Sequence, residues 1–98
     1  MSVHYELFMD QFETLVAENK YFTTDAGEAA VLFALKFQFL GFKKKDSEFQ
    51  YYFVFEYDAQ VPLLLAQYWE HTLMIDAKEV LWSFRTIKRR LSHHIQAQ

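Results

Sequence analysis

The feature that most constrains this fold is a segment with strict two-residue periodicity at residues 49–57. Its odd positions are all aromatic: Phe49, Tyr51, Phe53, Phe55 and Tyr57. Because successive side chains of a strand point to opposite faces, the five rings are expected to share one face. Sheets that stack nucleic-acid bases also carry aromatic rows, but with interleaved arginine or lysine, which this row lacks. The segment therefore predicts a strand whose aromatic face is covered by helices.

A second segment with a period of two precedes it and predicts the partner strand of an antiparallel hairpin. One face carries Phe37, Phe39, Gly41 and Lys43, and the other carries Gln38, Leu40, Phe42 and Lys44. Lys45, Asp46 and Ser47 provide the turn chemistry between the two strands. The β-favouring residues 21–23 predict a further short strand.

Helical periodicity appears in two segments of the amino-terminal third. Residues 3–19 carry apolar side chains at helical spacing, with an acidic edge, and predict an amphipathic helix: the apolar positions are Tyr5, Phe8, Phe12, Leu15 and Val16, and the acids are Glu6, Asp10 and Glu13. Residues 29–35 predict the buried body of a second helix. Thr24 or Asp25 is expected to cap it, with Glu28 at capping-box distance from either.

Two further helices are expected in the carboxy-terminal part. Pro62 is tolerated in the first turn of a helix that runs through about Thr72. This helix is so apolar that we expect it to be sandwiched between other elements. Asp76 and Glu79 form a D-x-x-E capping box before the last helix, residues 76–95.

Length and composition favour one α+β domain over residues 1–98. Residues 1–19 would form an added amino-terminal helix, and residues 20–95 would form the core, a small antiparallel sheet covered by three to four helices. Neither a signal peptide nor a membrane span is expected. The chain has no cysteine, which is consistent with a cytoplasmic location.

The last helix is predicted to have two contrasting faces. At about 100° per residue, one stripe is apolar and is expected to face the core: Val80, Phe84, Ile87, Leu91 and Ile95. The opposite stripe is basic with a tryptophan in its middle, and it is our candidate binding site: Lys78, Trp82, Arg85, Arg89 and His93. Such a stripe suits phosphate groups and stacked bases, a protein partner, or a second copy of the chain. Alternatively, the acids of the amino-terminal helix neutralise it.

A smaller basic cluster, Lys43, Lys44 and Lys45, lies near the predicted hairpin turn. Lysines at a hairpin tip can contact phosphate, but they more commonly keep a strand edge soluble and unpaired. The chain as a whole carries a net charge of −3, which argues against a general nucleic-acid binder.

The motifs give no indication of catalysis, of a metal or of a cofactor. With only two glycines the chain has no phosphate-binding loop, and it lacks the common hydrolase and zinc motifs. Adjacent His93 and His94 diverge by about 100° on a helix and do not readily share one metal ion. Glu56 and Asp58 are a conceivable carboxylate pair, but they are better interpreted as the solvent-facing end of a strand.

Several motifs together resemble a family of small bacterial and phage domains of unknown function. They are K-Y-F-T-T-D, A-A-x-L, F-x-F-L-G-F, F-V-F-E, Y-W, and I-D-A-K followed by I-K-R-R-L, over about residues 20–91. The family pattern has a glycine before the first hairpin strand, where this chain has Lys36. The resemblance implies a small sheet with helices, and it implies no activity.

We therefore expect a non-catalytic interaction protein without cofactors or a small-molecule substrate. It is expected to self-associate as a homodimer, because the apolar helix at 61–69 needs burial on both sides. It would use the basic face of the last helix to dock a partner. The alternative is a nucleic-acid-binding accessory or regulatory protein of a phage or mobile element.

Overall fold

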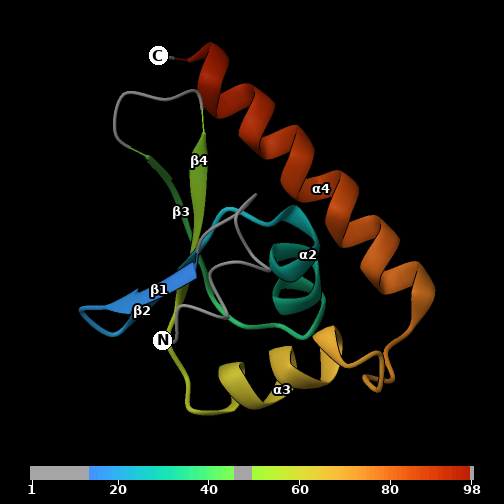
Figure 1. The fold of residues 1–98 in the computed structure, drawn as a ribbon. Helices are drawn as coiled ribbons and strands as arrows, with labels where there is room; N and C mark the ends of the chain where they lie inside the picture. Colours follow the sequence, from blue (N-terminus) through green and yellow to red (C-terminus); the bar gives the residue numbers. More distant parts are fainter. Residues whose placement is uncertain (1–13, 46–49, 98) are drawn as a thin grey trace.

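Four antiparallel strands and three helices form the part of the chain that the computed structural model describes, residues 14–45 and 50–97. The sheet has the order β1-β2-β4-β3 (Figure 1). Its strands are β1 (Thr14–Ala17), β2 (Lys20–Thr23), β3 (Phe39–Lys44) and β4 (Tyr51–Glu56), and the helices are α2 (Ala26–Ala34), α3 (Gln60–Trp69) and α4 (Ala77–Gln96). The predicted α+β class and β3–β4 hairpin are confirmed, as is the short strand predicted at residues 21–23, which begins one residue earlier, at Lys20.

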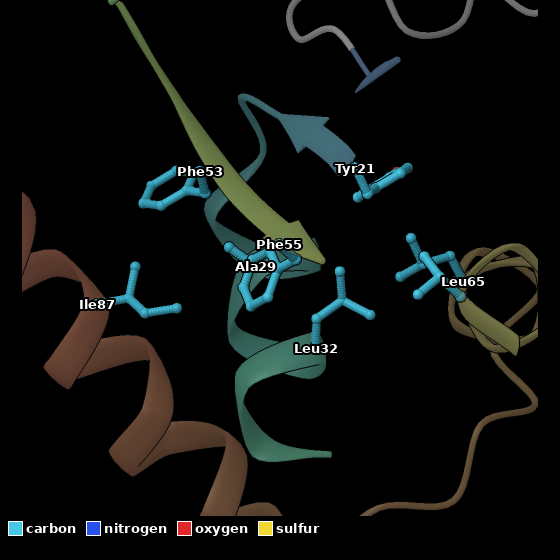
Figure 2. Packing of buried hydrophobic residues seen from close by; sticks show 8 residues of the cluster. Tyr21, Ala29, Leu32, Phe53, Phe55, Leu65 and Ile87 are labelled. Atoms are coloured by element: carbon cyan, nitrogen blue, oxygen red, sulfur yellow. The ribbon is translucent and has the colours of Figure 1, made fainter. Parts of the chain in front are cut away.

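The three helices contribute to a single hydrophobic core on one face of the sheet. Phe55 of β4 is fully buried at its centre. Ala29 and Leu32 of α2, Ile87 of α4 and Leu65 of α3 surround it (Figure 2). Phe53 and Phe55 therefore face the helices, as the alternation predicts, whereas Phe49 lies outside the described residues. The opposite face of the sheet carries a second buried cluster of Phe22, Tyr52 and Val54.

The first described strand contradicts the predicted helix over residues 3–19. Thr14–Ala17 pairs antiparallel with β2, in the register Leu15 to Phe22 and Ala17 to Lys20. Glu18 and Asn19 form the two-residue turn with φ of 55° and 62°, and a type I′ hairpin requires such left-handed values. Residues 14–19 are thus a hairpin rather than the end of a helix, and the rest of that prediction lies outside the described residues.

A β-bulge in β3 changes which side chains face the core. Phe39 pairs with Phe55 but Gly41 already pairs with Val54, so Leu40 is an extra residue in this strand. Gly41 has a φ of 125°, which favours glycine. As a result, Phe42 and not Gly41 shares the core face with Phe39. The predicted strict alternation through residues 37–44 is therefore wrong after Phe39.

Both ends of α2 have defined caps. At its start the Asp25 carboxylate accepts a hydrogen bond from the Glu28 amide at 2.9 Å, which confirms Asp25 as the cap. At its end Lys36 takes a φ of 72°. The Lys36 amide donates to Phe33 O and the Phe37 amide to Leu32 O, each at 3.1 Å. This is the Schellman pattern, with lysine at the position where glycine is usual.

Helix α3 is not sandwiched as predicted. Asp58 Oδ1 accepts from the Gln60 amide at 2.8 Å, and Pro62 lies in the first turn as expected. Only Val61 and Leu65 of this helix are buried, whereas Leu63 is 65% exposed. Helix α3 lies at the rim of the helical layer, and residues 14–45 and 50–97 cover only one of its sides (Figure 1).

Candidate interaction surface

Helix α4 begins where the capping signal places it and runs for 20 residues. The Asp76 carboxylate accepts hydrogen bonds from the amides of Lys78 and Glu79, at 2.8 and 3.2 Å. These two amides have no partner within the helix, so the cap fixes where α4 begins. From there α4 crosses α2, and its carboxyl end approaches the β3–β4 hairpin (Figure 1). His94 contacts the rings of Phe42 and Tyr51 there.

The buried face of α4 is rotated from the predicted apolar stripe. Ser83, Thr86 and Ile87 are the buried residues of the helix. Of the predicted core residues, only Ile87 is fully buried, whereas Phe84 and Ile95 are 39% and 45% exposed. Helix α2 has the sequence AGEAAVLFA and packs more extensively on α4 than any other element does. Small side chains on both helices allow this close approach, which outweighs the burial of a few larger apolar groups.

The five residues of the predicted binding stripe all lie on the exposed side of α4. They are Lys78, Trp82, Arg85, Arg89 and His93. Trp82 is 56% exposed, near the middle of the stripe. Exposed indole rings are uncommon because they leave a large apolar area in contact with water. In the following text this set of five residues is called the basic stripe.

Trp82 is held in position although it is exposed. One side of the indole packs on Phe33 of α2, with ring centroids 6.2 Å apart and planes tilted by 36°. The Arg90 guanidinium lies over the same Phe33 ring at 5.2 Å. Phe33 in turn makes an edge contact with Phe39 of the sheet. Phe33 could not be recognised from the sequence as a support for Trp82, because it lies within the apolar run 29–35 that was expected to be buried.

Within the segments that the structure describes, no lysine or arginine of α4 forms an ion pair. The single ion pair within residues 14–45 and 50–97 joins Lys36 Nζ to Glu79 at 3.5 Å, with both side chains well exposed. Arg85 and Arg89 thus have no ion-pair partner in that part of the chain. The acids that the sequence offered as neutralising partners, Glu6, Asp10 and Glu13, lie outside the described residues.

The second basic cluster does not form one surface. Lys43 and Lys44 are neighbours in β3 and point to opposite faces of the sheet. The Lys43 ammonium lies 5.6 Å from the Phe22 ring centroid. Lys45 Nζ approaches Gln50 Oε1 at 3.4 Å. Two of the three lysines thus have local contacts, and the strand geometry places Lys44 on the other face of the sheet from Lys43.

A buried carboxylate, which the sequence analysis treated only as part of a capping box, links three elements of the fold. Glu28 is 1% exposed. Its two oxygens accept hydrogen bonds from Tyr21 Oη and Trp69 Nε1, both at 2.6 Å. Burial raises the pKa of Glu28 above its ordinary value, and the hydrogen bonds from Tyr21, Trp69 and Thr23 oppose that shift. Glu28 thereby fastens β2 and α3 to α2.

The conceivable carboxylate pair of Glu56 and Asp58 lies at the end of a strand and before a helix. Glu56 is exposed at the end of β4, and the Asp58 carboxylate accepts from the Gln60 amide just before α3. Across the described segments no group of three or more His, Cys, Asp or Glu side chains is arranged to hold a metal ion.

Among the helices of residues 14–45 and 50–97, none is both long and apolar enough to cross a membrane.

Comparison with protein-family models, with curated proteins and with solved structures found no match to this chain. The resemblance to the small bacterial and phage domains stays a prediction from the sequence motifs.

Proposed function

We propose that this chain is a non-catalytic cytoplasmic interaction protein that docks a partner protein on the basic stripe of α4. The observation that carries the proposal is Trp82, whose ring is fixed against Phe33 yet remains largely open to solvent. Tryptophan and arginine are the residues most enriched among those that dominate binding energy at interfaces. A ring that is already held in place loses little freedom on binding, which favours its use as an anchor.

The charge of the stripe indicates the kind of partner. Arg85 and Arg89 flank the indole without an ion-pair partner in the described segments. A partner with acidic groups around an apolar pocket would cover Trp82 and compensate both guanidinium groups. Charged groups at the rim of such an interface mainly raise the association rate and select the partner.

Nucleic acid is the second candidate, favoured by the same exposed cations around a stacking ring. If the family resemblance holds, this candidate fits an accessory or regulatory role in a phage or mobile element. The apolar side chains of Leu81 and Phe84, exposed beside the stripe, favour protein over a phosphate backbone. We therefore rank nucleic acid below a protein partner.

Self-association belongs to the proposal as a separate contact through α3. Leu63 is 65% exposed on a helix that has few polar groups. A symmetric contact between two α3 helices would remove this side chain from water. The solution mass across a concentration series tests it: a parent dimer that Leu63→Glu converts to a monomer supports the contact, and a strict monomer excludes it.

Site-specific photo-crosslinking tests the partner proposal. A photoreactive phenylalanine analogue replaces Trp82 in one sample and the exposed Gln67 of α3 in a matched control, and both are illuminated in the cells that express them. We expect a crosslinked protein specific to position 82. An excess of the unmodified chain should abolish this crosslink by competing for the partner. The same excess of the Arg85→Glu, Arg89→Glu double variant should leave the crosslink unchanged. Identical products from positions 67 and 82 would contradict the proposal.

A gel-shift experiment with labelled DNA and RNA tests the second candidate. A nucleic-acid binder should shift the probe at low salt, lose the shift steeply as salt rises, and lose it in Arg85→Ala with Arg89→Ala. The absence of a shift at low salt excludes this candidate and leaves the protein partner.

A further inference from the structure

Helix α4 has a third face, distinct from its core face and from the basic stripe. Leu81 is 55% exposed on it, together with Phe84 and Ile95. These three side chains lie on the far side of the helix from Thr86 and are separated from Trp82 by about 100° or more around the axis. Docking at the basic stripe leaves these three side chains without an assigned partner, although Leu81 and Phe84 lie beside the stripe. In the following text this face is called the apolar seam.

The spacing of the apolar seam is that of a coiled-coil interface. The positions alternate by three and four residues: Leu81, Phe84, Lys88, Leu91 and Ile95. Leu91 is half-buried and also touches the core cluster. Lys88 is the one polar position, and its ammonium lies 5.7 Å from the Phe84 ring centroid, so its stem covers part of the seam. A single polar residue in such a seam fixes the register of the partner helix.

The two flanks of the seam differ in charge and in access. On one side Val80, Ile87 and His94 turn toward the molecule's own core or sheet. On the other side Lys78 and Arg85 are exposed. A helix seated in the seam therefore meets positive charge along its only open flank, and a partner with acids along that flank is favoured.

A second copy of this chain fits the seam poorly. In a parallel pair of α4 helices each seam position meets itself, so Lys88 would lie against Lys88 of the other copy. In an antiparallel pair that aligns Leu81 with Leu91, the open flanks bring Arg85 within about one turn of Arg85 of the other copy. Both arrangements oppose like charges. Nucleic acid also fits poorly, because the side chains of Leu81, Phe84 and Ile95 have neither a charge nor a hydrogen-bond donor for a phosphate.

We propose that the apolar seam binds an amphipathic helix of another protein that carries glutamate or aspartate along the flank facing Lys78 and Arg85. This contact goes beyond docking at Trp82, because the indole lies on a different face of α4. The close packing of α4 on α2 leaves these three apolar side chains exposed, and a partner helix would remove them from water.

The probe for the test is a synthetic three-heptad helix with leucine at its core positions and glutamate on its flanks. Like charges keep this peptide from pairing with itself. The matched control peptide carries lysine in place of each glutamate. Binding of each labelled peptide to the full chain is measured by fluorescence anisotropy. We expect the glutamate peptide to bind at least about tenfold more tightly than the lysine peptide, and rising salt should reduce the difference.

Variants of the chain assign the binding to the seam. The double substitution Leu81→Glu with Phe84→Glu should reduce the affinity for the glutamate peptide by about tenfold or more. Leu63→Glu on α3 and Trp82→Ala should leave this affinity unchanged. Circular dichroism shows whether each variant keeps its helices. Equal binding of the two peptides, no binding of the glutamate peptide, or binding unaffected by the Leu81 and Phe84 substitutions would overturn the inference. Crosslinks at position 82 test the proposed function separately, so either can fail alone.

Discussion

Glu28 and Trp69, 41 positions apart in the chain, are joined by a hydrogen bond of 2.6 Å from the indole Nε1 to a carboxylate oxygen. The other oxygen of Glu28 accepts from Tyr21 Oη. A strand and a helix are therefore attached to α2 through one buried acid. Buried charges of this kind are costly unless they are well paired by hydrogen bonds.

The raised pKa of Glu28 predicts a pH-dependent stability. Because burial raises the folded-state pKa of Glu28 above its ordinary value of 4.5, the folded chain binds more protons than the unfolded chain between the two pKa values. The contribution of Glu28 to stability therefore falls as pH rises from about 4.5 through the folded pKa. Glu28→Gln keeps both contacts, since its Oε1 accepts from Trp69 and its Nε2 donates to Tyr21 Oη.

Urea unfolding of the parent and of Glu28→Gln, at about pH 5 and about pH 8, measures this effect. We expect the variant to gain stability relative to the parent as pH rises. Glu28→Ala is the control: it removes the carboxylate that accepts the hydrogen bonds from Trp69 and Tyr21, and it should lower the free energy of unfolding by about 2 to 4 kcal/mol. If the parent instead becomes more stable relative to Glu28→Gln as pH rises, the pKa of Glu28 is not raised in the folded chain.

Lys36→Gly should stabilise the chain by about 0.5 to 1 kcal/mol. Lysine at this position has a left-handed φ of 72°, which glycine adopts without steric cost. The exposed ion pair with Glu79 that is lost contributes less than this gain. Lys36→Ala removes the same ion pair but keeps the steric cost, so it serves as the control. Thermal unfolding in which Lys36→Gly is no more stable than Lys36→Ala would argue against the observed cap.

The type I′ turn at Glu18 and Asn19 predicts that Glu18→Asn with Asn19→Gly stabilises the first hairpin by about 0.5 to 1 kcal/mol. Asn-Gly is the preferred pair for this turn. In a helix the same change would be unfavourable, because glycine has a low helix propensity. The sign of the change in the urea midpoint therefore distinguishes the hairpin from the helix that periodicity suggested.

The rotation of α4 predicts unequal effects on stability for two substitutions that are two positions apart in the helix. Ser83→Leu adds apolar volume where α2 and α4 approach closely, and it should lower the free energy of unfolding by about 1 to 3 kcal/mol. Leu81→Ser removes an apolar side chain from the surface and should change it by less than about 0.5 kcal/mol. Chemical unfolding of both variants checks this order. If Leu81→Ser is the more damaging, the helix is oriented as the hydrophobic pattern alone suggests.

The elements that the sequence predicted well are those set by local interactions. Three such features depend only on neighbours within a few residues. They are the alternation around Phe53 and Phe55, the caps at Asp25 and Asp76, and the place of Pro62 in the first turn of α3. These features were confirmed because the fold adds nothing that competes with them.

The features that the sequence missed are set by distant partners. The bulge at Gly41 depends on how β3 fits against β4. The strand at residues 14–17 depends on pairing with β2, which helical spacing of apolar residues does not reveal. The core face of α4 depends on the small side chains of α2, and the role of Glu28 depends on Tyr21 and Trp69. Periodicity within one element contains none of this information.

The basic stripe itself was predictable, because it requires only that residues 77–96 form a helix. Phe33, which supports the Trp82 ring from another helix, was not. The stripe's role as a docking surface stays a proposal, and the exposed indole at its middle allows a direct test.

Hydroxyl-radical labelling of the two tryptophans, in the purified chain and in the cells that express it, tests that role most directly. In the purified chain Trp82 should be oxidised several-fold more than Trp69, which is only partly exposed and donates to Glu28. If a partner covers the basic stripe, oxidation of Trp82 in cells should fall to the level of Trp69, while Trp69 itself is unchanged. Equal oxidation of Trp82 in the two settings, or protection of Trp82 in the purified monomer, would contradict the account.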